Sequence, residues 1–149
     1  MDSVKGPLRK LFCCELKYAR YDAADGQWIL KIDGRNVPVL WVWLQGSVKL
    51  KGKGRMQVVL SDTTGEVNVI VCSRMEKHIT ALPFDNWCNL IGELVQPTKL
   101  ADSAVVSVKA KKLVNVNLSD NPFPKKSWAA QVYDYHQWLK QHAATEDAQ

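Results

Sequence analysis

The chain has 149 residues, a formal net charge of +5 and a pI of about 9.0, a basic balance that permits contact with nucleic acid without establishing it. Its apolar fraction of 46% and charged fraction of 23% are ordinary for one globular domain with a real core. No apolar run approaches the roughly 18 residues that a membrane span needs, and the N-terminus lacks the apolar centre of a signal peptide, so we expect a soluble cytosolic or nuclear protein.

Two turn signals divide the first part of the chain. Residues 1–10 are polar and are predicted to be flexible. Residues 11–21 fit either a first strand or a short helix, and both interpretations stay open. Residues 27–32 follow Gly26 and are typical of a short strand. Asp33-Gly34 then predicts a tight turn that lets this strand pair with the segment that follows.

Residues 39–50 form the longest apolar segment and are rich in the β-branched and aromatic residues that strands favour. Both faces of its first half are apolar, so both are expected to be covered. Gly46 interrupts the segment, and a glycine inside a strand often marks a bulge or bend. A small closed barrel needs such a bend where a long strand crosses from one side to the other.

Four shorter strands are expected after this segment, with a tight turn at 61–65 between the first two: 56–60, 66–72, 87–95 and 104–116. Residues 74–81 are predicted to be helical, ended by Pro83. This order predicts an all-β fold, a five-stranded OB-fold barrel with a short helix between its third and fourth strands and a C-terminal α-helix. A small open sandwich is the alternative.

The predicted organisation is one barrel with appendages. Residues 11–122 form the barrel with its N-terminal extension, after the flexible residues 1–10. Residues 123–142 form a partner-docking helix, with Ser127 as its N-cap, and residues 143–149 a flexible tail.

No pattern of catalytic or metal-binding residues stands out. The four cysteines form no C-x-x-C pair, and the three histidines share no helix face: Cys13, Cys14, Cys72, Cys88; His78, His136, His142. Asp62 and Asp120 lie in turns and are more simply turn formers than acid–base groups. The sequence therefore predicts reduced thiols, no cofactor, no metal and no enzymatic activity.

A single-strand-binding site would need a basic groove and aromatic platforms. The basic half is present in one loop, which Lys109, Lys111 and Lys112 could extend: Lys49, Lys51, Lys53 and Arg55. The predicted strands 56–60 and 66–72 contain no aromatic residue, so the stacking half is missing. A single-stranded DNA-binding module remains the alternative function.

The C-terminal helix carries an apolar stripe with aromatic flanks at Tyr133 and Trp138. The stripe residues recur at helical spacing: Trp128, Val132, Tyr135 and Leu139. The helix could pack on its own barrel or dock onto another chain. Docking is favoured, because the helix follows all five strands and carries the residue types that dominate interfaces.

Two segments carry a family resemblance. Val42-Trp-Leu-Gln-Gly-Ser-Val48, and Leu118-Ser-Asp-Asn-Pro122 with Trp128 after it, resemble the RecQ-mediated genome instability protein 2 family. The strand order also looks like the middle subunit of replication protein A. The motif residues are Trp43, Gln45, Gly46, Leu118, Asp120, Asn121, Pro122 and Trp128.

The resemblance implies a nuclear, non-catalytic subunit of the complex of a RecQ-type, Bloom-like helicase with topoisomerase III. Such a subunit binds the OB domain of RecQ-mediated genome instability protein 1 through its helix and barrel, with Trp43, Asp120 and Asn121 among the implied contacts. The assembly dissolves double Holliday junctions and limits crossovers, and the paired barrels offer a surface to a Fanconi anaemia-type translocase peptide. DNA binding by the subunit alone is expected to be weak or indirect. The lysine-rich loop and Lys125-Lys126 depart from the family pattern, and a telomere-type OB subunit is a further alternative.

Overall fold

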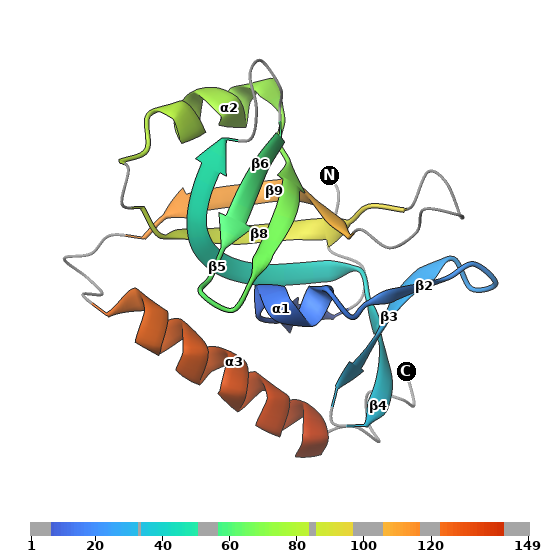
Figure 1. Ribbon diagram of the computed structural model, residues 1–149. Helices are drawn as coiled ribbons and strands as arrows, with labels where there is room; N and C mark the ends of the chain where they lie inside the picture. Colours follow the sequence, from blue (N-terminus) through green and yellow to red (C-terminus); the bar gives the residue numbers. More distant parts are fainter. Residues whose placement is uncertain are drawn as a thin grey trace.

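The computed structural model describes residues 7–32, 34–50, 57–83, 86–96, 106–116 and 123–141. Figure 1 shows a closed barrel, a small sheet beside it and a long helix along its outer surface. The elements in chain order are β1 (Leu8–Lys10), α1 (Cys13–Leu16), β2 (Arg20–Asp22), β3 (Gln27–Ile32), β4 (Arg35–Val39), β5 (Trp41–Leu50), β6 (Gln57–Ser61), β7 (Glu66–Ile70), α2 (Ser73–Thr80), β8 (Cys88–Leu94), β9 (Ser107–Asn115) and α3 (Pro124–Gln141).

Five strands close the barrel in the order β5-β6-β7-β9-β8, and a pairing of β8 with β5 completes the circle. β7 and β9 run parallel, and the other pairs of the barrel are antiparallel. Helix α2 connects the third barrel strand to the fourth. This confirms the predicted OB-fold barrel, and closure rules out the open sandwich. The core holds the inward side chains of these strands, among them Val42, Leu44, Leu60, Leu90 and Val108.

The bend predicted at Gly46 is present and is the point where β5 changes partner. Residues Trp41–Gly46 pair with β8, whereas Ser47–Leu50 pair with β6. A Cβ atom on Gly46 would lie 2.6 Å from the backbone oxygen of Ser61, so only glycine lets β6 approach this closely.

The N-terminal residues differ from their expectation. Residues 8–10, predicted to be flexible, form β1, which runs parallel to the start of β5. Arg9 explains why these residues form a strand, because its side chain is buried and its Nε and Nη2 both donate to the carbonyl of Pro38. Residues 11–21, left open between strand and helix, contain the short helix α1 and the start of β2.

Helix α1 is fixed by the turn between β6 and β7. The N–H of Cys13 donates to the Asp62 carboxylate at 2.7 Å, and the N–H of Cys14 donates to the Thr64 hydroxyl at 3.2 Å. Asp62 also accepts the N–H groups of Thr64 and Gly65, which agrees with its interpretation as a turn former. One buried carboxylate therefore both shapes a hairpin and caps a helix.

A three-stranded meander, β2-β3-β4, stands beside the barrel. The predicted strand 27–32 is β3, and it pairs with the next segment as expected from the turn signal. The expected strand 39–50 is divided, since Val39 ends β4 and β5 begins at Trp41.

The two later helices have slightly different bounds from those predicted. Helix α2 is close to the expected 74–81. Helix α3 begins at Pro124, and Ser127 lies in its first turn with its N–H donated to the carbonyl of Phe123 at 3.0 Å, so Ser127 is not the N-cap. Proline is favoured at a first helical position because its fixed φ suits the helix and its missing N–H has no partner there.

We expect Gly46→Ala to lower the free energy of unfolding by about 2 kcal/mol, because the added methyl group collides with the β6 backbone. Urea denaturation followed by tryptophan fluorescence measures the change. Gly65→Ala is the matched control, since a Cβ there meets Cys14 at 3.4 Å, an ordinary contact. Equal losses for the two variants would contradict the close-approach argument.

Candidate partner-binding surface of the C-terminal helix

Helix α3 lies along the barrel with one stripe turned inward. Trp128 is 1% exposed, and Val132, Leu139 and Pro124 are also buried. Tyr135 is partly buried against the main core. Burying these side chains removes several large apolar groups from water, and a full-size side chain contributes about 1.5–3 kcal/mol when buried.

Trp128 and Val132 belong to a small apolar cluster outside the barrel core. Its buried members are Trp87, Trp128 and Val132, with Phe12, Trp43 and Val116 packed against them. The rings of Trp43 and Trp128 have centroids 6.0 Å apart and are tilted by 38°. Because Trp43 belongs to β5 and Trp87 immediately precedes β8, this cluster joins α3 to the two strands that close the barrel.

A chain of side-chain amides lies beneath the tryptophans. The indole N–H of Trp43 donates to Asn89 Oδ1 at 3.0 Å, and Gln45 Nε2 donates to the same oxygen at 2.6 Å. The indole N–H of Trp87 donates to Gln45 Oε1 at 2.7 Å. Gln45 is buried, so the network satisfies polar groups that would otherwise be costly to bury. The motif residues Trp43, Gln45 and Trp128 are thereby brought together.

Two lysines border the tryptophan cluster. The ammonium of Lys10 lies 4.4 Å from the ring centroid of Trp43, and that of Lys125 lies 5.6 Å from the ring centroid of Trp87. Both distances are within the range of cation–π attraction. Lys125, which departs from the family pattern, therefore contacts a tryptophan of this chain.

The second half of α3 is held by polar contacts with the N-terminal elements. Arg9 Nη1 donates to the Tyr135 hydroxyl at 3.1 Å, and His136 Nε2 lies 3.2 Å from a carboxylate oxygen of Glu15. Tyr135 also stacks on Trp138, with centroids 6.1 Å apart and planes 16° from parallel. These contacts define the orientation of the helix about its own axis.

The structure revises the role expected for the apolar stripe. Trp128, Val132 and Leu139 were expected to dock onto another chain, but their own barrel covers them. The sequence could not decide between these alternatives, because an inward and an outward apolar stripe have the same spacing. Asp120 and Asn121, with Leu118 and Pro122, lie outside the described residues.

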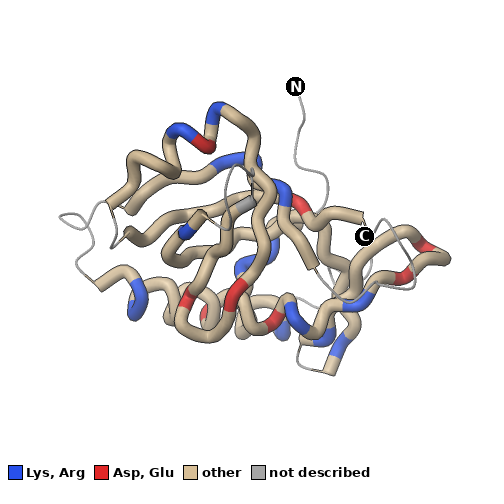
Figure 2. The backbone as a smooth tube through the Cα atoms, turned by 45° about the horizontal axis from the view of Figure 1, so that its top comes forward, with Lys and Arg blue, Asp and Glu red and all other residues tan. Residues whose placement is uncertain are grey.

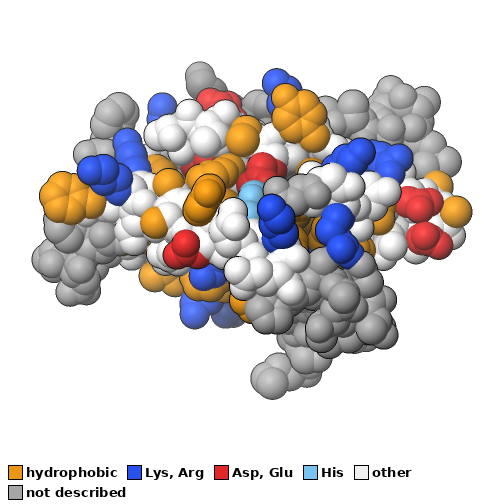
Figure 3. All heavy atoms as spheres, turned by 90° about the horizontal axis from the view of Figure 1, so that it is seen from below, with side chains coloured by type: hydrophobic (Ala, Val, Ile, Leu, Met, Phe, Trp, Pro, Cys, Tyr) orange, Lys and Arg blue, Asp and Glu red, His pale blue; other side chains and the backbone are white. Residues whose placement is uncertain are grey.

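The outer face of α3 retains large aromatic side chains. Tyr133 is 65% exposed and Trp138 is 47% exposed, while Phe123, just before the helix, is also exposed. Ala129 and Ala130 are exposed one turn earlier. Figure 3 looks onto this side of the molecule, where apolar side chains lie among basic ones. We call Tyr133 and Trp138 with Ala129 and Ala130 the outer α3 face.

The outer surface of the barrel differs from the α3 surface in its described side chains. One row across four strands contains Lys49, Val59, Asn68 and Ser107, which pair in register. This row has no aromatic side chain, in agreement with the prediction that stacking platforms are missing from these strands. Lys111 forms an ion pair with Glu93 at 3.5 Å. Lys51, Lys53 and Arg55 lie outside the described residues, and Figure 2 shows basic and acidic positions interspersed over the described chain.

The four cysteines are free thiols in different environments. Burial, with the nearby Asp62 carboxylate adding to it, raises the pKa of Cys13 far above its ordinary value. Burial also raises the pKa of Cys88 to about 11. Cys72 is exposed just before α2, where the backbone N–H of Met75 stabilises the thiolate and lowers the pKa.

The described ranges contain neither a metal-binding group of side chains nor a membrane-spanning helix. No three of their His, Cys, Asp and Glu side chains are grouped so as to hold a metal ion. No helix among those residues combines the length and apolar character needed to cross a membrane.

Comparison with known proteins identifies one family. The sequence model described as RecQ-mediated genome instability protein 2 matches residues 7–136. No curated protein matches the chain in sequence. These results indicate no enzyme family.

Solved structures of low sequence identity share the fold. A chain of the S. pombe Stn1–Ten1 complex has a TM-score of 0.68 at 12% identity, with 92% of this chain and 96% of that chain covered. A chain of a replication protein A heterotrimer bound to single-stranded DNA has a TM-score of 0.59 at 15% identity, with 88% and 98% covered. A chain of yeast replication protein A bound to single-stranded DNA has a TM-score of 0.59 at 12% identity, with 97% and 95% covered.

We expect Trp128→Ala to lower the free energy of unfolding by about 3–5 kcal/mol, as truncation of a buried tryptophan does. Tyr133→Ala, on the same helix but exposed, is expected to change it by less than about 0.5 kcal/mol. Chemical denaturation measures both. A loss below about 1 kcal/mol for Trp128→Ala would mean that α3 is not seated through this ring.

Cys72 is expected to react with iodoacetamide at lower pH than an ordinary thiol, because a lowered pKa gives more thiolate at a given pH. Cys13 and Cys88 stay protonated below their raised pKa values and are expected to remain unlabelled in the folded protein at pH 8. Peptide mass spectrometry between pH 6 and 9 follows each site. Labelling of Cys13 at the rate of Cys72 would be inconsistent with these environments.

Proposed function

Because the chain belongs to the RecQ-mediated genome instability protein 2 family, we propose that it is a non-catalytic OB-fold scaffold subunit of a RecQ helicase–topoisomerase III complex. In this role it binds the OB domain of RecQ-mediated genome instability protein 1. By completing that interface it stabilises a nuclear assembly that dissolves double Holliday junctions and limits crossovers.

The observation that supports this proposal most directly is the outer α3 face. Tyr133 and Trp138 remain exposed on the two flanks of the stripe of the same helix that packs against the barrel. Tryptophan and tyrosine are the residues most enriched in interface hot spots, and their exposure on one rigid helix prepares them to bind a partner. Ala129 and Ala130 are small, so a second helix could approach the α3 backbone closely in the preceding turn.

The way α3 is seated favours a preformed interface. Trp128, packed on Trp43, fixes one part of the helix, and Arg9 fixes Tyr135 in another. A helix held in this way loses little conformational freedom on binding, which improves affinity without new contacts. The barrel therefore acts as the platform that presents the helix to its partner.

Two finer assignments belong to the same proposal. The paired barrels of the two subunits would present a surface to a Fanconi anaemia-type translocase peptide. DNA contact by this subunit alone stays secondary, because the described outer row at Lys49, Asn68 and Ser107 contains no stacking side chain. The family identity and the outer α3 face together favour the scaffold function over the single-strand-binding alternative.

We expect a Tyr133→Ala/Trp138→Ala double variant to lose about 30-fold or more in affinity for the partner's OB domain, as the removal of hot-spot aromatics does. Isothermal titration calorimetry with the purified partner domain measures the loss. Tyr133→Ala alone should account for part of it without disturbing the Tyr135–Trp138 stack.

Tyr18→Ala is the matched control, because Tyr18 is exposed just after α1 rather than on the outer α3 face. It should bind the partner domain as the unaltered chain does. Unchanged affinity in the double variant would remove the outer α3 face from the interface. Salt-sensitive binding of single-stranded DNA by the chain alone, together with no partner binding, would favour the alternative function.

A further inference from the structure

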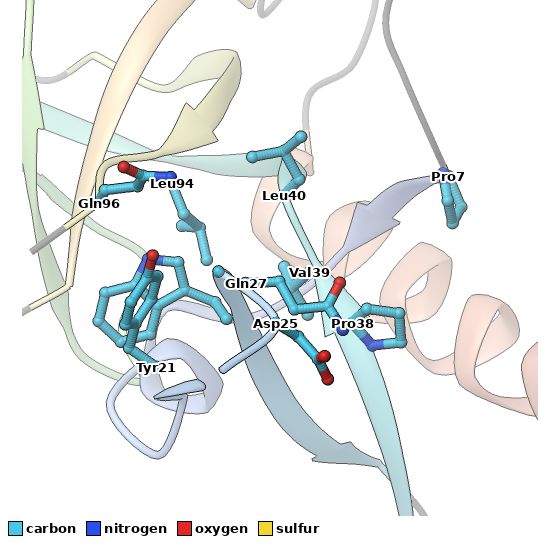
Figure 4. Close-up of a pocket in the computed structure, with 11 residues that line it drawn as sticks. Pro7, Tyr21, Asp25, Gln27, Pro38, Val39, Leu40, Leu94 and Gln96 are labelled. Atoms are coloured by element: carbon cyan, nitrogen blue, oxygen red, sulfur yellow. The ribbon is translucent and has the colours of Figure 1, made fainter. Parts of the chain in front are cut away.

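An apolar pocket lies where the β2–β3–β4 meander meets the ends of β5 and β8. Its cavity volume is about 410 Å³, at the lower end of the range of ligand sites. Figure 4 shows the lining residues, which come from the β2–β3 hairpin, the end of β4 and the end of β8, with Pro7 at the N-terminal side. The outer α3 face contributes no residue to it.

The pocket wall is a fixed apolar surface. Tyr21 and Trp28 meet edge to face, with ring centroids 5.4 Å apart. The indole N–H of Trp28 donates to the carbonyl of Val95 at 3.0 Å. This hydrogen bond holds the ring against the barrel and leaves the ring with no unpaired N–H group facing the cavity. Leu40 also lines the pocket and is 44% exposed, so a ligand in the pocket can reach its side chain.

Charge at the pocket has one sign. Asp25 is the only charged residue among those described as lining it, and it is exposed. Asp22, three residues earlier, adds a second carboxylate to the same turn, where its Oδ1 accepts the backbone N–H groups of Ala24 and Asp25. Within the described residues no cation pairs with Asp25. On a chain of net charge +5, these carboxylates give the rim of the apolar cavity a local negative charge at the β2–β3 turn.

We propose that this pocket binds a linear peptide segment of another protein that carries one bulky apolar side chain next to a lysine or arginine. The apolar side chain packs against Tyr21, Pro38 and Leu40, which are at least partly exposed, and the cation pairs with Asp25 at the rim. A cavity of this size accommodates one or two side chains, not a folded surface. The pairing of an apolar anchor with an adjacent cation follows from the charge of the rim. The inference is independent of the function proposed for the outer α3 face.

The probe is a phage-displayed library of linear twelve-residue peptides selected on the immobilised full chain. We expect the enriched peptides to share a large apolar residue within two positions of a lysine or arginine. Synthetic copies should lose about tenfold or more in affinity on Leu40→Asp, which places a charge at the anchor site. Asp25→Asn should weaken them about two- to fivefold and reduce their salt dependence, as the loss of an exposed ion pair does.

Leu50→Asp is the matched control, because Leu50 is 45% exposed on the same strand as Trp41 but lies away from the pocket. It should bind the selected peptides as the unaltered chain does, and thermal unfolding checks that all variants fold. Three results would overturn the proposal: no enrichment, binding that Leu40→Asp leaves intact, or enriched peptides without a cation that ignore Asp25→Asn. Sedimentation showing a dimer that Leu40→Asp dissociates would assign the pocket to a second copy of the chain instead.

Discussion

The change of partner in β5 at Gly46 is the constraint on which the other features depend. Before the glycine, β5 pairs with β8 and its Trp43 and Gln45 contact the tryptophan and amide network. After it, the strand pairs with β6 and continues around the barrel. Because the glycine has no Cβ, β6 can come close enough to pair with the second part of β5. One strand is therefore part of both the closed barrel and the surface on which α3 packs.

The way α3 packs on the barrel determines which of its residues a partner can contact. Inward side chains are committed to the tryptophan cluster and the barrel core, and the contacts of Tyr135 and His136 fix the rotation of the helix. The aromatic side chains that remain exposed are thereby presented at fixed positions. Packing inside the chain and binding outside it use largely different side chains of the same helix. Trp138 serves both, because it also stacks on Tyr135, so substitution of Tyr133 separates the two roles more cleanly.

The sequence predicted the barrel well because its signals are local. Gly46, the turn at 61–65 and the alternating valines of β7 each specify a neighbouring structure, and the order of strands follows from them. Long-range contacts were not predictable in the same way. Nothing near Arg9 in the sequence indicates that its guanidinium reaches Pro38 and Tyr135, so residues 8–10 were expected to be flexible. The direction of the α3 stripe was misassigned for the same reason, while the flanking Tyr133 and Trp138 were already visible as aromatic additions.

The bond between Arg9 and Tyr135 joins residues 126 positions apart in the sequence, and this separation affects the order of folding. Contacts between distant residues form late, because loop closure costs entropy before the contact stabilises anything. During synthesis the strands emerge before α3, so Trp43 and Trp87 on the barrel lack the ring of Trp128 until the last helix is available. Nascent chains accordingly pass through a stage in which the barrel surface later covered by α3 exposes apolar side chains. A chaperone or an early-bound subunit would have its greatest effect in that interval.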